Sequence, residues 1–228
     1  MRLLTTALLL CWGLSSATAQ TDTVVYLRPT DTLFTYLHPM GELMFTHRIQ
    51  GKQTLYSLAK FYGLTIEELY AYNPGLSATY KLGTPVRIPL PRKALIFAEP
   101  PPAMLPGLVP VYYIVPRGET LYNLSKRVFG VPQEFLIARN PMLQAGLKPG
   151  QRLHIGWMAR QPIPSDWHEI KGGPYARMNH RYKLTYFNDS RGKRIREETG
   201  AATWPKDMKG NSGFICLHRK ARINSLVE

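Results

Sequence analysis

The chain has few cysteines, the residues that form disulfide cross-links. Two of its 228 residues are cysteines, and Cys11 lies in an apolar N-terminal stretch that we expect to be removed, which leaves Cys216. A single cysteine cannot form an intramolecular disulfide, so a disulfide-stabilised scaffold is excluded and the fold has to depend on packing. We expect Cys216 to be buried as a small apolar side chain.

Long apolar runs are missing after the first twenty residues. The run from Leu3 to Leu14 follows the positive charge of Arg2 and precedes the small residues Ala17 and Ala19. This order predicts a secretory signal peptide over residues 1–19. The run is shorter than the ~20 residues that a membrane span needs. We therefore expect an exported protein of the periplasm or cell envelope, with no transmembrane segment in the mature chain.

Acidic residues are scarce. The chain has 15 Asp and Glu against 29 Lys and Arg, and loss of Arg2 with the leader lowers the formal net charge from +14 to +13. Such a charge favours polyanionic surroundings, so anionic envelope polymers are candidate partners. The export signal and the lack of a basic run beside stacking aromatics argue against nucleic acid.

One stretch of sequence occurs twice. Residues 53–63 read QTLYSLAKFYG and residues 119–130 read ETLYNLSKRVFG, with one extra residue in the second copy. The identities continue through Asn73-Pro74 and Asn140-Pro141 to Gly83 and Gly150. An internal repeat of about 45 residues indicates two copies of one structural unit.

Each copy predicts a strand, two helices and a second strand. Thr54 and Thr120 are N-cap residues before an apolar stripe at helical spacing, and Gly63 and Gly130 end that helix. The second helix begins at once, through the capping box of Thr65 and Glu68 in the first copy, and ends where Asn-Pro forbids continuation. Short β-branched runs at 45–49, 86–88, 111–115 and 153–155 supply the strands.

The fold class is therefore α+β, with two small βααβ modules. The segment between them contains Pro100-Pro101-Pro102, and such prolines predict an extended spacer that holds the modules apart. We expect a poorly structured basic region after the second module, with one short strand over 182–187. The expected divisions are a signal peptide 1–19, a lead-in 20–44, module one 45–91, a proline-rich linker 92–109, module two 110–157, a linker 158–197 and a terminal fragment 198–228.

The motifs of the two copies resemble the LysM family. The second copy carries Gly118-Glu119-Thr120-Leu121 and, later, Leu147-Lys148-Pro149-Gly150, while the first has Lys52-Gln53 in place of the usual glycine and acid. The resemblance implies a βααβ module that binds N-acetylglucosamine glycans, in bacteria mostly peptidoglycan. It places the sugar in a shallow groove between the loop after the first strand and the loop after the second helix.

The resemblance also implies which residues line the two grooves. In the first module they are Gly51, Lys52, Gln53, Thr54, Asn73, Pro74, Gly75 and Leu76. In the second they are Gly118, Glu119, Thr120, Leu121, Asn140, Pro141, Met142 and Leu143. Helix capping and termination are the competing explanation for the Thr and Asn-Pro positions. A side chain at Lys52 resists positive φ, so we expect an altered first loop and a more typical groove in the second module.

The last segment resembles the start of a rare-lipoprotein-A-type double-psi β-barrel, through Gly200-Ala201-Ala202-Thr203-Trp204 and Leu217-His218-Arg219. About thirty residues cannot close such a barrel, so we expect a truncated fragment. The spacing of His168, His180, Cys216 and His218 matches no compact metal site, and nothing pairs Glu198 with Asp207. We expect no metal, no cofactor and no catalytic residues.

Three functions remain open at this point. The first is non-catalytic binding of peptidoglycan glycan strands in the cell envelope. The second is a truncated remnant of a peptidoglycan-cleaving enzyme, and the third is a protein-binding scaffold in an envelope assembly.

Overall fold

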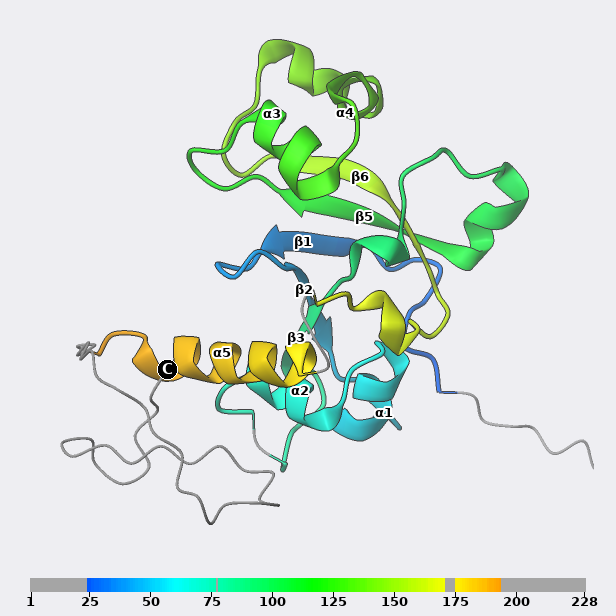
Figure 1. Ribbon diagram of the computed structural model, residues 1–228. Helices are drawn as coiled ribbons and strands as arrows, with labels where there is room; N and C mark the ends of the chain where they lie inside the picture. Colours follow the sequence, from blue (N-terminus) through cyan, green and yellow to red (C-terminus); the bar gives the residue numbers. More distant parts are fainter. Residues whose placement is uncertain (1–23, 77, 171–174, 194–228) are drawn as a thin grey trace, which may run out of the picture.

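A computed structural model describes residues 24–76, 78–170 and 175–193. Its centre is a six-stranded sheet in the order β3-β2-β1-β5-β6-β4 (Figure 1). The strands are β1 (Leu33–Leu37), β2 (Leu43–Arg48), β3 (Pro85–Pro89), β4 (Leu95–Ile96), β5 (Leu108–Ile114) and β6 (Arg152–Ala159). The expected signal peptide, Cys216 and the expected terminal fragment 198–228 lie outside the described residues.

The first module has the expected strand-helix-helix-strand order. β2 is followed by α1 (Leu55–Phe61) and α2 (Ile66–Tyr72), and β3 pairs with β2 antiparallel. Both helices begin with a capping box, Thr54 with Ser57 and Thr65 with Glu68, so two of the free amides at each helix start are satisfied. Gly63 follows α1 with φ 70°, which confirms the glycine stop.

The second module has the same order but a different first helix. Its parts are β5, α3 (Leu121–Asn123), η3 (Leu124–Phe129), α4 (Gln133–Arg139), the 3₁₀ turn η4 (Pro141–Ala145) and β6. η3 is a π-helical turn in which the Gly130 amide donates to the Ser125 carbonyl. A π turn holds one more residue than an α turn. The extra residue of the second copy is therefore absorbed inside the helix, and both flanking ends keep their places.

The two modules are joined rather than held apart, so that expectation is wrong. β1, from the lead-in, pairs antiparallel with β2 and parallel with β5. Thr35 is in register with both Phe45 and Tyr113, and its hydroxyl donates to the Tyr112 carbonyl at 2.9 Å. One strand thus completes the sheet edges of both modules and merges them into one sheet.

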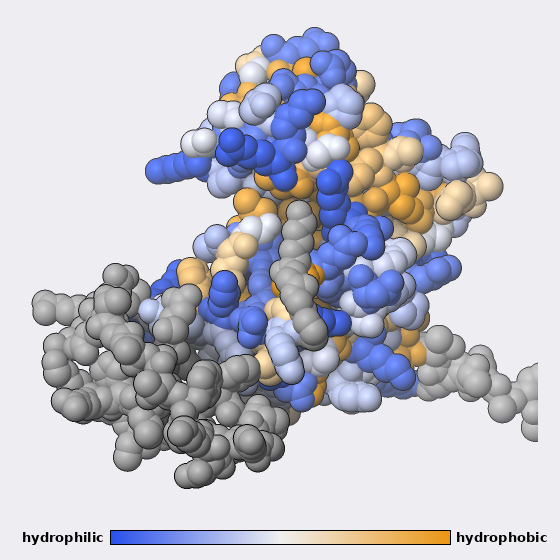
Figure 2. All heavy atoms as spheres, in the orientation of Figure 1, coloured by the Kyte–Doolittle hydropathy of each residue, from blue (hydrophilic) through white to orange (hydrophobic). Residues whose placement is uncertain are grey.

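The spacer between the modules is folded onto the second one. It contains the 3₁₀ turns η1 (Arg92–Ala94) and η2 (Pro102–Gly107), and β4 lies antiparallel to β6. The Arg139 guanidinium donates to the carbonyls of Phe97 and Ile155 and so ties the spacer to β6. Figure 2 shows hydrophobic side chains gathered near η2 and β5, where Met104 and Leu105 are exposed.

The chain after β6 returns to the first module. Ile163 donates its amide to the Phe61 carbonyl, and the short turn η5 (Ser165–Trp167) follows. The backbone lies so close to Gly63 that a Cβ there would be 2.6 Å from the Ile163 carbonyl oxygen. We call residues 160–168 the return segment.

The strand expected over 182–187 is wrong, because these residues belong to α5 (Ala176–Ser190). α5 lies beside α2 of the first module (Figure 1). Arg177, His180, Leu184 and Asn188 recur at helical spacing and contact that module. Three of these four contacts are polar. The helix therefore lacks the apolar stripe from which an amphipathic helix is predicted in a sequence. Its docking depends on partners distant in the chain, such as Glu68.

Candidate glycan-binding grooves

The loop after β2 makes the first side of the groove expected in the first module. Gly51, Lys52 and Thr54 are exposed, and Lys52 has φ 67°. Gly118, its counterpart in the second module, has φ 76°. Lys52 therefore keeps the left-handed turn that its counterpart makes with glycine, at a cost of roughly 1–2 kcal/mol for a residue with a Cβ.

Gln53 lies beneath this loop and is only 4% exposed. Its Oε1 accepts from the Gln50 amide and lies 2.8 Å from His47 Nε2, while its Nε2 donates to the Val25 carbonyl. An amide oxygen only accepts, so His47 carries its proton on Nε2, and its Nδ1 accepts from the Tyr62 hydroxyl at 3.1 Å. The Gln53 side chain thus supports the loop from inside.

His47 is held neutral in this network. Burial lowers its pKa from the ordinary value of 6.5, against smaller opposing effects from the Gln53 hydrogen bond and the Asp31 charge. The neutral ring is the form that accepts the Tyr62 hydroxyl, so the hydrogen bonds and the protonation state support each other.

The loop after α2 makes the second side of the first groove. Asn73 is buried, and its side chain spans two elements: Nδ2 donates to the carbonyls of Leu69 and Arg87, and Oδ1 accepts the Arg87 amide at 2.7 Å. Pro74 and Gly75 are exposed and Leu76 is half-buried. The asparagine therefore fixes where the loop leaves the helix, and the next two residues face outward while Leu76 packs against the core.

The second module repeats this construction. The Asn140 side chain donates to the carbonyls of Leu136 and His154 and accepts the His154 amide at 2.7 Å. Pro141 and Met142 are exposed, with Met142 at 52%, whereas Leu143 is 5% exposed. Among the residues expected in this loop, Met142 presents the largest apolar surface.

The loop after β5 is stabilised by hydrogen bonds to the carboxylate of Glu119. Glu119 Oε1 accepts from the Thr120 amide and from Asn123 Nδ2, each at 2.8 Å. The Thr120 hydroxyl accepts the Asn123 amide and so caps α3. Gly118 and Thr120 are exposed, and Glu119 and Leu121 are half-buried. The capping role expected for Thr54 and Thr120 is thus observed in both modules.

The two grooves differ at one position that bridges the loops. In the first module the Tyr80 hydroxyl, from the loop before β3, donates to the Gln53 carbonyl at 3.2 Å. The equivalent position in the second module is Leu147, which has no hydroxyl to donate. The two loops of the first expected groove are therefore linked by a hydrogen bond that Leu147 cannot form in the second.

Sequence reasoning missed one repeated surface residue. Tyr56 and Tyr122 lie in the first turns of α1 and α3, next to the capping threonines, and are 69% and 60% exposed. The signal was present, because tyrosine stands at this position in both copies. An exposed ring with a hydroxyl at its edge suits a sugar, which has an apolar face and polar edges.

The histidines considered as metal ligands have other partners. His168 Nε2 lies 2.7 Å from the Tyr62 carbonyl oxygen, and His180 Nε2 lies 2.7 Å from Glu42 Oε1. Within the described ranges no group of three His, Cys, Asp or Glu is placed to hold a metal. Glu198, Asp207, Cys216 and His218 fall outside those ranges. The described helices include none long and apolar enough to cross a membrane.

The comparisons with known proteins agree with the repeat. The family model of the LysM domain matches twice, at residues 47–89 and 113–156. LysM domains in general bind glycans of the peptidoglycan or chitin type. No curated protein matches.

Solved structures with detectable similarity include the spore cortex-lytic enzymes SleL of Bacillus cereus and of Bacillus megaterium QM B1551, and the ectodomain of a receptor like kinase. Their identities are 24%, 19% and 18%, and their TM-scores are 0.22, 0.20 and 0.22, in that order. The matches cover 49%, 58% and 56% of this chain, but 22%, 24% and 62% of those proteins. Such scores carry no inference about activity.

Proposed function

We propose, from the premise that this chain carries two LysM domains, that it binds N-acetylglucosamine-containing glycan such as peptidoglycan without cleaving it. The observation that carries the proposal is the repeated pair of loops in each module. In both copies a buried asparagine and a capping threonine fix two turns, and small or exposed residues follow them. Exposed backbone at Gly and Pro turns can meet N-acetyl groups, while an apolar side chain packs against their methyls.

The sixteen expected groove residues then divide by role. Gln53, Asn73 and Asn140 act by positioning the turns, because their side chains are buried and already hydrogen-bonded. The exposed members of each set are available to contact the sugar. Met142 and the unbridged loops favour the second module as the stronger binder.

The shared sheet changes how the two grooves cooperate. A flexible linker would let each module find a sugar independently, whereas β1 pairs with both modules and fixes their spacing. Two grooves at a fixed spacing gain avidity only on glycan that presents two sites at that distance. We therefore propose a preference for polymeric over short soluble glycan.

The proposed location is the cell envelope outside the cytoplasmic membrane. It is supported by the signal-peptide pattern of residues 1–19 and by the typical occurrence of LysM domains in envelope proteins. The net positive charge adds a salt-dependent attraction to anionic envelope polymers.

The test is retention on purified peptidoglycan sacculi with matched methionine variants. Met142→Ala removes the largest apolar contact of the second groove, and we expect retention to weaken three- to tenfold. Met104→Ala is the control, because Met104 is equally exposed at 52% but lies in η2, outside both expected grooves. Equal retention of the two variants would contradict the assignment of the glycan-binding groove to this loop. If the unaltered protein is not retained at low salt, the result favours the protein-binding scaffold function.

The absence of cleavage has its own test. A zymogram containing peptidoglycan should show no clearing at the position of the refolded protein. Clearing would contradict the non-catalytic assignment and support the enzymatic alternative.

A further inference from the structure

A pocket of about 420 Å³ lies between the two modules, away from the loops that form the expected grooves. Its walls come from the turn between β1 and β2, from α2, from η1, from the end of η3 and from α5. Most of these segments are additions to the repeats, so neither module alone would form it. A volume of this size is within the range of small-ligand sites, roughly 300–1,000 Å³.

The pocket combines an apolar lining with charges of both signs. Phe129, Leu90 and Leu184 are buried side chains of its wall. The same wall holds three carboxylates, four Lys or Arg side chains and two histidines. An apolar ligand such as a lipid chain would take these charged groups out of water without offering them hydrogen bonds, which is costly even for charges that are already paired. A polyanion such as a phosphate chain would meet the carboxylates.

One side of the pocket offers a hydrogen-bond acceptor. Glu42 Oε1 lies 2.7 Å from His180 Nε2, but Glu42 Oε2 is buried and has no hydrogen-bond partner. His38 Nδ1 lies 3.5 Å from Oε2, but it accepts the Met40 amide and so directs no proton at the carboxylate. A buried acceptor without a donor costs about 1–3 kcal/mol.

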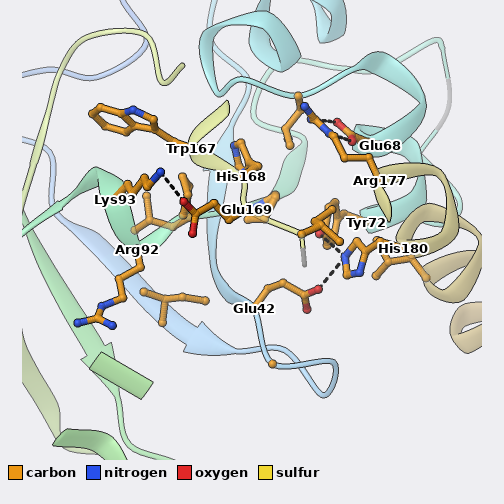
Figure 3. Close-up of a pocket in the computed structure, with 18 of the residues that line it drawn as sticks. Glu42, Glu68, Tyr72, Arg92, Lys93, Trp167, His168, Glu169, Arg177 and His180 are labelled. Atoms are coloured by element: carbon orange, nitrogen blue, oxygen red, sulfur yellow. Dashed lines mark hydrogen bonds and ion pairs between the residues drawn. The ribbon is translucent and has the colours of Figure 1, made fainter. Parts of the chain in front are cut away.

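The same carboxylate stays ionised. Burial by itself would raise the pKa of Glu42, but the His180 hydrogen bond, its own backbone hydrogen bond and the nearby histidines together lower it. The Tyr72 hydroxyl lies 3.0 Å from the same His180 nitrogen and completes this side (Figure 3). The side therefore suits an amine or another N–H donor.

The opposite side offers cations. Figure 3 shows Arg92 and Lys93 on the side of the pocket opposite His180, with the Lys93 amine directed toward Glu169 and the Arg92 guanidinium directed away from Glu42. Arg92 Nη2 donates to the Gly130 carbonyl, and this uses one of the five N–H donors of a guanidinium. Lys93 pairs with Glu169, but both side chains are more than half exposed, and such a pair is weak enough to exchange with a ligand carboxylate.

We propose that this pocket binds a short zwitterionic peptide, with its amine at Glu42 and its carboxylate at Arg92 and Lys93. The apolar wall between the two ends would pack against small side chains such as alanine. Peptides of this class are attached to the glycan of peptidoglycan, so occupation would add a second chemical group of one polymer to those recognised. The site is separate from the grooves, and its test does not depend on glycan binding.

The test is calorimetric titration of the full chain with the synthetic tetrapeptide L-Ala-γ-D-Glu-L-Lys-D-Ala. We expect saturable binding that weakens at least tenfold when the peptide is N-acetylated on both amines and its carboxylates are amidated. This comparison uses the unaltered protein, so it does not depend on the folding of a variant. No binding, or equal binding of the charged and capped peptides, would overturn the proposal.

Two substitutions locate the site. Glu42→Gln keeps an oxygen for His180 but removes the charge, and it should weaken the peptide at least tenfold. Glu134→Gln, on the exposed first turn of α4, is the matched control and should leave the affinity unchanged. Retention of the Glu42 variant on chitin, which carries no peptide, should equal that of the unaltered protein, and this separates the pocket from the grooves. Equal effects of the two substitutions on peptide binding would place the peptide elsewhere.

Discussion

Asn73 and Asn140 show how single residues serve both the fold and the proposed groove. Each makes three hydrogen bonds that join the end of a helix to the closing strand. Buried amides of this kind have to be fully satisfied to be stable. The competing explanations for these positions, structure and binding, are therefore compatible, because the same bonds that end the helix place the outward-facing turn.

Lys52 gives a prediction at this scale. Lys52→Gly should stabilise the protein by about 0.5–1 kcal/mol, since glycine adopts φ 67° without strain but loses more entropy on folding. Urea denaturation of the two proteins measures the difference. Gly118→Lys, at the equivalent turn, should do the opposite, and a destabilising Lys52→Gly would show that contacts of the lysine outweigh the strain.

His47 gives a pH-dependent prediction. Because its pKa is lowered in the folded protein, the unfolded state binds the proton more readily, and the stability it contributes is complete above the ordinary value of 6.5. That stability is lost as pH falls below 6.5 toward the folded pKa, with a slope of at most about 1.4 kcal/mol per pH unit.

Thermal unfolding between pH 7.5 and 5 measures this loss of stability. A His47 variant separates the contribution of His47 from those of the other buried histidines. Burial lowers the pKa of His38, His154 and His168 as well, so they contribute in the same direction. His47→Gln should flatten the dependence relative to the unaltered protein. An unchanged slope in that variant would assign the effect to the remaining histidines.

At the scale of elements, the return segment and α5 decide how the first module is covered. Arg177 forms two hydrogen bonds with the Glu68 carboxylate, at 2.7 and 2.6 Å, and Glu68 also closes the capping box of α2. One carboxylate thus begins one helix and docks another. Because Glu68 serves both helices, α5 is held against the start of α2, whose position is set by the repeated fold of the module.

The return segment can be tested with a pair of glycines. Gly63 and Gly75 both have positive φ, but a Cβ on Gly63 would lie 2.6 Å from the Ile163 carbonyl oxygen, whereas Gly75 has open space. Gly75→Ala should cost about 1 kcal/mol from backbone strain. Gly63→Ala should cost about 2–4 kcal/mol, because overpacking adds to that strain. If the two variants lose the same free energy of unfolding in denaturant titrations, the return segment is not closely packed against the end of α1.

At the scale of the whole molecule, the two modules share one interior. A single cluster of buried side chains includes Leu58 and Ile88 of the first module and Leu124 and Ile155 of the second. β1 hydrogen-bonds to both, so unfolding one module would expose surface of the other. We expect one cooperative unit.

Calorimetry tests this expectation. Thermal unfolding should give one transition whose calorimetric and van't Hoff enthalpies agree. Thr35→Pro, which places a residue without an N–H in the central strand, should split or strongly lower that transition. Two independent transitions in the unaltered protein would show that the modules unfold separately.

The sequence by itself determined the two βααβ modules and the positions of their turns. Caps, glycine stops and Asn-Pro helix ends act within a few residues, so their effect is readable locally, and the extra residue of the second copy was visible as an insertion although its π turn was not. The role of the lead-in was left unassigned, the spacer was expected to hold the modules apart, and a short strand was expected where residues 182–187 form part of α5. Only the tertiary structure decided their places, because an edge strand or a polar helix becomes stable through partners far away, as between Thr35 and Tyr112 or Arg177 and Glu68. Those distant pairings also formed the pocket, which no local pattern encodes.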